Sequence, residues 1–210
     1  MNMKWPSDPH LRKWMLFVDG ENLTFRGQDV AKSNSLTLSE GAHYKKDVFL
    51  WFPKVHARQA LTNTENTTHV QYKAVRSFYY TSLVGDETAI RGVQNNLRKL
   101  GFEPRVFKKI SRDKKTKAVD VTLVTELLSN AYSDNYDVAV IVTGDGDFIS
   151  AIEEVKRRGK IVYVGFFGKY GLSPEIELSA DERLELEDFF VDQWKLGDSP
   201  PRQEVVGAKQ

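Results

Sequence analysis

The chain has 210 residues, of which 40% are hydrophobic, 28% are charged and 11% are aromatic, and its formal net charge is +1. This composition excludes a disordered chain, because disorder requires few apolar residues and a high net charge. Cysteine is absent, which excludes disulfide bonds, thiolate zinc sites and cysteine nucleophiles and fits a reducing, cytoplasmic compartment. Neither a signal-peptide pattern nor an apolar run of about 18 residues occurs, so we expect no membrane partner.

Strand-like and helix-like segments alternate along most of the chain. Short apolar or β-branched runs are typical of buried strands, and apolar residues recurring once per helical turn are typical of helices. In chain order, the sequence predicts a strand at 14–18, a strand at 74–81, a helix at 86–100, a strand at 104–110, a helix at 119–131, a strand at 136–142, a helix at 148–158 and a strand at 161–166. Because parallel strands need crossover helices, this order predicts an α/β fold with a doubly wound parallel sheet of about five strands and helices on both faces.

Residues 28–71 interrupt this alternation. The segment is polar and rich in Asn and Thr at both ends, whereas its middle, KKDVFLWFPKVHARQALT, is denser in apolar residues. We interpret it as an insertion with at least one amphipathic helix, placed where it can cover a ligand site. Residues 195–210 are rich in Pro, Gly and polar side chains, which predicts a flexible tail after one domain at 1–194.

Four aspartates stand where predicted strands end or predicted helices begin: Asp19, Asp120, Asp145 and Asp147. The carboxyl ends of parallel strands meet at one edge of a sheet, so we expect the four side chains to share that edge. Carboxylates gathered there repel each other, and Mg²⁺ or Mn²⁺, which prefer oxygen ligands, relieve the repulsion. Such a cation activates water and offsets charge on a phosphoryl group. The competing interpretation is that each aspartate only caps a helix or forms a turn.

Lysine and arginine crowd the segment 108–117, directly before the helix that carries Asp120. Phosphate backbones bind to local cation clusters, so this segment, with Lys114 and Lys115, is a candidate for substrate binding. A solvated, lysine-rich loop explains the same pattern without a ligand. The C-terminal part is acidic instead, so charge is segregated along the chain although the net charge is small.

Other hydrolase classes lack their motifs. The histidines show no HxxxH or HExxH spacing, which argues against a zinc hydrolase. Neither a GxSxG elbow nor a P-loop occurs, so serine hydrolases and P-loop NTPases are set aside. A magnesium-dependent phosphatase stays a weaker alternative, because DGEN lacks the DxDx arrangement that such enzymes often use.

Four segments resemble, in the right order, the NYN domain, the LabA-like branch of the PIN-like ribonuclease superfamily. They are FVDGENL, KAVDVTLVTELL, VAVIVTGDGDFISAIEEVKRRGKIVYVGF and LSADERLELEDFFVDQW. The resemblance covers most of the chain and is strongest at 117–166. It implies a Rossmann-like, PIN-like sheet, acidic residues around Mg²⁺ or Mn²⁺, and nuclease activity on RNA.

The resemblance also implies roles for individual positions. The family's acidic positions, which hold the metal and act in catalysis, match Asp19, Asp120, Asp145 and Asp147. Positions that meet the substrate or orient the acids match Asn22, Lys117 and Thr143. The family's closing motif is matched only in part, so neither Asp181 nor Asp188 receives a site role.

We therefore expect a metal-dependent ribonuclease in which three aspartates hold the metal and Asp147 is a further ligand or orients the attacking water. The three are Asp19, Asp120 and Asp145. RNA is the expected partner, and homo-oligomerisation is left open. The alternative is a regulatory module for RNA binding or protein interaction that keeps the fold and has negligible turnover.

Overall fold

The structure, a computed structural model, describes residues 11–59, 71–111 and 117–197. Lys114, Lys115 and most of the expected tail therefore lie outside the described residues. The strands of the main sheet are β1 (Leu11–Asp19), β4 (Gln71–Leu83), β5 (Glu103–Lys108), β6 (Val138–Val142), β7 (Ile161–Phe166) and β8 (Glu182–Glu185). The α-helices are α1 (Gly20–Ser33), α2 (Glu87–Lys99), α3 (Lys117–Tyr132), α4 (Ile149–Arg157), α5 (Pro174–Ser179) and α6 (Glu187–Gly197). The smaller elements are the strands β2 (Tyr44–Lys45) and β3 (Phe49–Leu50) and the 3-10 helices η1 (Ala57–Gln59) and η2 (Gly146–Phe148).

The main sheet is parallel throughout and has the strand order β5-β4-β1-β6-β7-β8. β1 lies near its centre, where Phe17 is paired with Phe78 of β4 and with Ile141 of β6. From β1, the chain first adds β4 and β5 on one side of the sheet and then β6, β7 and β8 on the other. The direction of winding therefore reverses between β1 and β6. The carboxyl ends of these two strands form the topological switch point, where doubly wound sheets bind ligands. The predicted α/β fold is confirmed, with six strands in the main sheet where about five were expected.

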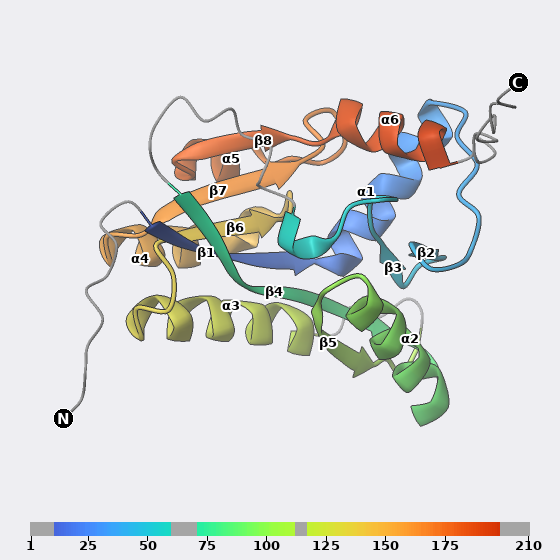
Figure 1. The fold of residues 1–210 in the computed structure, drawn as a ribbon, viewed down its shortest axis with the longest axis horizontal. Helices are drawn as coiled ribbons and strands as arrows, with labels where there is room; N and C mark the ends of the chain where they lie inside the picture. Colours follow the sequence, from blue (N-terminus) through green and yellow to red (C-terminus); the bar gives the residue numbers. More distant parts are fainter. Residues whose placement is uncertain (1–10, 60–70, 112–116, 198–210) are drawn as a thin grey trace, which may run out of the picture.

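Helices cover both faces of the sheet (Figure 1). Leu16 and Val18 of β1 belong to the core that α1, α2 and α6 cover, whereas Met15 and Phe17 belong to the core that α3, α4 and α5 cover. Successive side chains alternate in this way because a strand points them to opposite faces. Both faces are buried, which explains why the central strands read as continuous apolar runs.

The described part of the apolar middle, up to residue 59, forms the β2–β3 hairpin and the short helix η1, so the amphipathic helix expected in the insertion does not form in these residues. Every side chain from 48 to 52 is buried, and a helix on the surface would leave part of this unbroken apolar run in water. Hydroxyl groups of β4 hold the hairpin. Tyr79 Oη donates to Leu50 O at 3.0 Å and accepts from Leu50 N at 3.0 Å, and the Thr81 hydroxyl donates to Val48 O.

The sixth strand, β8, escaped the sequence prediction, as did helices α1, α5 and α6. β8 has the sequence ERLE, in which Leu184 is the one apolar residue, so it lacks the apolar run that marks a strand. Asp181 ties its start to β7, because its carboxylate accepts from Val162 N at 2.8 Å and its own N–H donates to Val162 O at 2.9 Å. Asp181 thus has a structural role at the amino end of these strands.

Gly20 follows the aspartate at the end of β1, and its position requires glycine. A Cβ atom there would lie 2.1 Å from Tyr79 Cε1 and 2.6 Å from the carbonyl oxygen of Tyr80. The missing side chain lets α1 begin directly beside β4. The Asp-Gly pair in the sequence therefore marks a close approach of backbones as well as the end of a strand.

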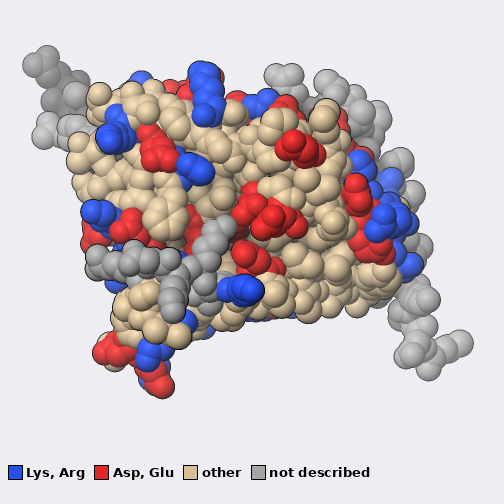
Figure 2. All heavy atoms as spheres, turned by 180° about the vertical axis from the view of Figure 1, so that it is seen from behind, with Lys and Arg blue, Asp and Glu red and all other residues tan. Residues whose placement is uncertain are grey.

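Charge is distributed unevenly over the surface. In the view from behind, acidic side chains gather near the middle of the face and basic side chains gather along one edge (Figure 2). Within the described ranges, no helix has the length and apolar character needed to cross a membrane.

The substitution Tyr79→Phe tests how the hairpin is held. Phenylalanine keeps the ring in the core but leaves the N–H and C=O of Leu50 without their buried partner, so we expect unfolding free energy to fall by about 1–3 kcal/mol. Tyr132→Phe is the control, because the hydroxyl of Tyr132 donates to Glu154 at the exposed surface. Urea denaturation measures both variants, and equal midpoints would contradict the inferred anchor.

Candidate functional site

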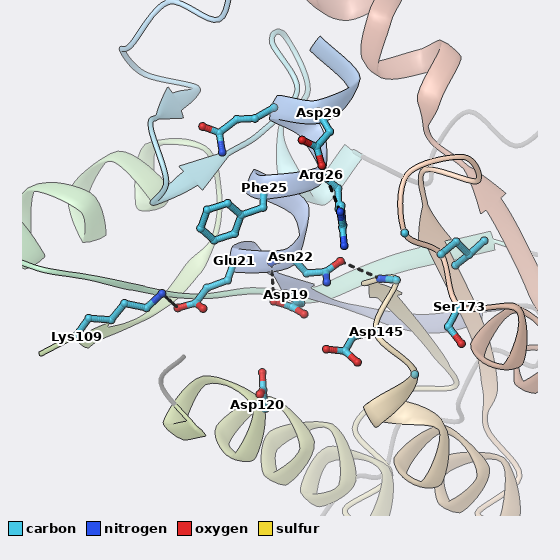
Figure 3. A pocket seen from close by; sticks show the side chains of 15 residues that line it. Asp19, Glu21, Asn22, Phe25, Arg26, Asp29, Lys109, Asp120, Asp145 and Ser173 are labelled. Atoms are coloured by element: carbon cyan, nitrogen blue, oxygen red, sulfur yellow. Dashed lines mark hydrogen bonds and ion pairs between the residues drawn. The ribbon is translucent and has the colours of Figure 1, made fainter. Parts of the chain in front are cut away.

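A pocket of about 990 Å³ opens at the carboxyl ends of β1 and β6, at the switch point of the sheet. We call it the acidic pocket; its acidic lining residues are Asp19, Glu21, Asp29, Asp120 and Asp145. Its basic lining residues are Arg26 and Lys109. The side chains of Asp19, Asp120 and Asp145 converge from β1, α3 and the loop after β6 (Figure 3). Three of the four aspartates singled out in the sequence therefore meet in one pocket.

Asp19 is the last residue of β1 and the N-cap of α1. Its carboxylate accepts from Asn22 N at 3.2 Å and from the Thr143 hydroxyl at 3.0 Å. The residue is only 4% exposed, and burial raises its pKa from 3.8 to about 7, outweighing these two hydrogen bonds, which lower it. The charges of Asp120 and Glu21 raise the pKa further. An ionised Asp19 is therefore costly unless a cation compensates for it.

The loop after β6 is held against α1 by hydrogen bonds. Gly144 N donates to Asn22 Oδ1 at 3.2 Å, and Asp145 N donates to Thr143 Oγ1 at 3.2 Å. Thr143 is completely buried, so its hydroxyl orients Asp19 and the backbone of Asp145 and does not reach a substrate. Of the two roles expected for Thr143, these hydrogen bonds support orientation of the acids rather than contact with the substrate. Asn22 lines the acidic pocket while its side-chain oxygen fixes the loop.

The first glycine of the GDGD element, Gly144, has a packing role. A Cβ atom on it would lie 2.3 Å from the carbonyl oxygen of Gly171 and 2.5 Å from Phe166 Cδ1. The loop after β7 therefore runs directly against the loop after β6, and a larger residue would push the two apart. This contact fixes the backbone from which Asp145 projects.

Asp145 both caps a helix and lines the acidic pocket. It is the N-cap of η2, and its carboxylate accepts from Asp147 N at 3.0 Å. Asp120 lies in the first turn of α3 and is half-buried. For Asp145, capping a helix is thus compatible with lining the pocket, because a cap uses only part of a carboxylate's capacity to accept hydrogen bonds.

Asp147 and Lys117 are not brought into the acidic pocket. The side chain of Asp147 is exposed and does not line the pocket, because the 3-10 turn η2 carries it outward. Its backbone N–H supports Asp145 instead. Lys117, the first residue of α3, is exposed and also does not line the pocket. Neither Asp147 nor Lys117 thus lines the acidic pocket in this arrangement, and a role for either at the site stays a prediction from the sequence.

In the ranges that the structure describes, no three His, Cys, Asp or Glu side chains form a ready-made cluster for a metal ion. The structure thus places Asp19, Asp120 and Asp145 in one pocket but does not bring their carboxylates into a ready-made cluster. Mg²⁺ keeps several of its waters and takes few carboxylates, so a three-carboxylate cluster is not required. The donors are all hard oxygens, and the buried acid has a raised pKa, which fits Mg²⁺ or Mn²⁺.

Glu21 and Lys109 form a buried ion pair on the wall of the acidic pocket, a pairing that the sequence does not reveal. Lys109 Nζ lies 3.0 Å from Glu21 Oε1, and the two side chains are 8% and 14% exposed. The Ser82 hydroxyl donates to the same carboxylate oxygen. Glu21 follows Asp19-Gly20 directly and is therefore visible in the sequence as a further oxygen donor, whereas nothing distinguishes Lys109 within a lysine-rich segment.

Arg26 is a second residue that sequence reasoning missed. It lies one helical turn after Asn22 on α1 and lines the acidic pocket. Its guanidinium rests against Gly171, where a Cβ atom would lie 2.6 Å from Arg26 Nε, and it pairs with Asp29 at 3.3 Å. The side chain is 46% exposed, so a flexible cation stands beside the convergent aspartates.

Comparisons with known proteins agree with this architecture. An uncharacterized protein of Methanocaldococcus jannaschii is 31% identical over 98 residues, which are 46% of this chain and 37% of that protein. The chain thus matches little more than a third of the length of this curated relative. A protein of unknown function from Vibrio parahaemolyticus has a crystal structure that aligns with a TM-score of 0.60 at 21% identity, covering 88% of this chain and 98% of the other. This likeness shows a shared fold.

The family assignment comes from a model of the whole domain. The NYN domain model matches residues 13–187, which include all but the first two residues of β1, the loop after β6 and every residue of the acidic pocket. The match spans most of the chain, from within β1 to a point just after β8, and so covers the parallel sheet. The protein therefore belongs to the NYN domain family.

Proposed function

We propose that this protein is a metal-dependent ribonuclease that hydrolyses phosphodiester bonds of RNA. The observation that carries the proposal is the buried carboxyl of Asp19, whose pKa is raised to about 7 in a pocket shared with Asp120 and Asp145. Desolvated acids with perturbed pKa values in a cleft are typical of functional sites. Membership of the NYN domain family, which is usually associated with nucleases, supports the same reaction class.

Asp19, Asp120 and Asp145 are the residues that would hold Mg²⁺ or Mn²⁺. A cation bound there would supply water activation and compensation of the negative charge that develops on the phosphoryl group. The protein's own part is positioning. Thr143 holds the carboxylate of Asp19 through its hydroxyl, and Asn22 fixes the loop that carries Asp145. Asp147 remains outside this set and supports Asp145 through its backbone.

Arg26 is the residue that we assign to the substrate phosphate. Its guanidinium is held beside the aspartates between Asp29 and Gly171, and a planar guanidinium matches phosphate oxygens in a bidentate way. Lys109 is neutralised by Glu21, so it contributes less net attraction. Binding roles for Lys114, Lys115 and Lys117 stay predictions from the sequence.

An RNA-binding module with the same fold and no turnover is the second candidate. One observation favours it: within the described ranges, no three acidic or imidazole side chains form a ready-made metal cluster. Such a module would keep RNA affinity and lack metal-dependent cleavage. The experiment on Asp145 separates the two candidates.

Asp145→Asn should lower metal-dependent cleavage of labelled RNA by roughly 100-fold or more, because the amide still caps η2 but no longer offers an anionic metal ligand. Cleavage is measured with single-stranded and structured RNA in Mg²⁺, in Mn²⁺ and in chelator. Asp86→Asn is the matched control, since Asp86 also caps a helix by accepting from Ala89 N at 2.8 Å but does not line the acidic pocket.

Cleavage that persists in chelator or in the Asp145→Asn variant would refute the metal-dependent mechanism. RNA binding without cleavage by the wild-type protein under every metal tested would favour the binding module. Equal losses in the Asp86→Asn control would indicate that capping, and not the acidic pocket, sets the activity.

Asp19→Asn should stabilise the metal-free protein at alkaline pH. The pKa of Asp19 is raised to about 7 by folding, so its protonated form favours the native state, and this contribution is lost as pH rises from about 4 through 7. Asparagine carries no charge at any pH. At pH of about 8 in chelator we expect a melting temperature higher than wild type by on the order of 5 °C, shrinking to nothing near pH 4.

Thermal melts across this pH range check the prediction, with and without Mg²⁺. Added Mg²⁺ should raise the melting temperature of the wild type and leave the Asp19→Asn variant nearly unchanged, because the variant lacks one ligand. Asp86→Asn is the control, since Asp86 also caps a helix and does not line the acidic pocket. A destabilised Asp19→Asn variant at alkaline pH without metal would contradict the electrostatic account.

A further inference from the structure

A second pocket adjoins the acidic pocket on the side of β4 and β5. Its volume is about 540 Å³, and Phe25 and Lys109 line both pockets. The residues of the β2–β3 hairpin form one wall of the second pocket, and the carboxyl end of β4 forms another. The two pockets are therefore neighbours on either side of Phe25 and Lys109, one at the convergent aspartates and the other at the hairpin.

Phe25 stands at the junction of the two pockets. It projects from α1 on the side of Glu21 and Lys109, whereas Arg26 lies on the other side (Figure 3). The residue is 44% exposed although the apolar face of α1, with Leu23 and Val30, is fully buried in the core. An exposed aromatic ring on the wall of a polar hollow offers a flat apolar surface to a ligand.

The second pocket differs from the acidic pocket in charge. Its charged lining residues are Lys45, Lys46, Lys109, Glu40 and Asp47. Lys109 is already neutralised by Glu21, so the two hairpin lysines are balanced by two anions and the pocket lacks the acidic excess of its neighbour. In the acidic pocket, two cations face five anions. Val84 at the end of β4 is 48% exposed and adds apolar surface to the second pocket. A ligand with an anionic backbone and flat apolar groups therefore matches the second pocket better than a cationic or purely apolar ligand.

We infer that the second pocket binds a nucleotide of single-stranded RNA adjacent to the phosphodiester in the acidic pocket, with its unpaired base stacked on Phe25. The identity of the ligand rests on the proposed function. Lys45 and Lys46 face the phosphates of this strand, and Val84 faces the base or sugar. Volumes of this size suit one nucleotide, and aromatic platforms next to lysines are typical of binding sites for single strands.

Stacking on Phe25 explains why the second pocket would select single-stranded RNA over duplex RNA. A base can place its face on Phe25 only if that face is not already covered by a neighbouring base pair. The junction position of Phe25 also fixes a direction, because a strand whose phosphate meets the aspartates must pass the ring before it reaches the hairpin. Duplex RNA can approach the same surface only through its phosphates.

Binding is measured in the Asp145→Asn background, where cleavage is suppressed, with a fluorescein-labelled oligouridylate and Mg²⁺. Phe25→Ala should weaken affinity roughly 5- to 150-fold, which corresponds to loss of one stacked base, and Phe25→Trp should retain or increase it. Affinity for a duplex of the same length should stay unchanged in Phe25→Ala. A 2-aminopurine in the strand should lose its binding-induced quenching in Phe25→Ala.

Tyr132→Ala is the matched control, because Tyr132 is a 53% exposed aromatic residue at the far end of α3. Phe25 is half exposed, and circular dichroism with thermal melts verifies that each variant is folded. Unchanged affinity for the single strand in Phe25→Ala overturns the inference. Equal weakening for single strand and duplex also overturns it, since stacking would then not be the cause.

The experiment separates this inference from the proposed function. Wild-type protein that binds single strands through Phe25 but never cuts them would refute the nuclease and support the stacking site. Cleavage that is unaffected by Phe25→Ala at substrate concentrations below KM would refute the stacking site and leave the nuclease standing. A wild-type protein without affinity for any RNA overturns both.

Discussion

The parallel pairing of β1 with β6 is the constraint on which the site depends. It places Thr143, which follows β6, beside Asp19 at the end of β1, so that a hydrogen bond joins residues 124 positions apart. The same pairing brings Gly144 against Asn22 and sets Asp145 opposite α3. Because the helices after the two strands leave on opposite faces, the space between them stays open and becomes a pocket.

Much of the fold could be predicted because strands buried on both faces have continuous apolar sequences. Such sequences can be recognised without knowing which elements pack against them. The aspartates were predictable for a related reason. Asp19 and Asp145 directly follow apolar strands, and the carboxyl ends of parallel strands must share one edge. Asp120 was found because it begins a helix reached from that edge. These predictions needed only periodicity and topology.

The remaining features depend on tertiary neighbours that the sequence does not display. Asp147 stands two residues after Asp145 in the same motif, yet the 3-10 turn carries it out of the pocket. Lys109 resembles every other lysine in its segment until burial pairs it with Glu21. The apolar run of the hairpin resembles that of a helix in the sequence. It forms a hairpin because hydroxyl groups of β4 bond to its backbone C=O groups, which the sequence does not display. The local sequence cannot show which side chains line the pocket or whether an apolar run forms a helix or a hairpin, because tertiary packing determines both.

The central place of β1 also has a consequence for biosynthesis. β1 ends at Asp19 and its partner β6 ends at Val142, so the middle of the sheet cannot close until all the residues between the two strands have left the ribosome. Contacts so distant in sequence form slowly, because a long loop must be ordered before they are gained. Asp19 is synthesised before β6 and stays solvated and ionised at neutral pH until β6 pairs with β1 and buries it. The nascent chain therefore has no acidic pocket, and any activity that depends on the pocket begins only when β6 docks.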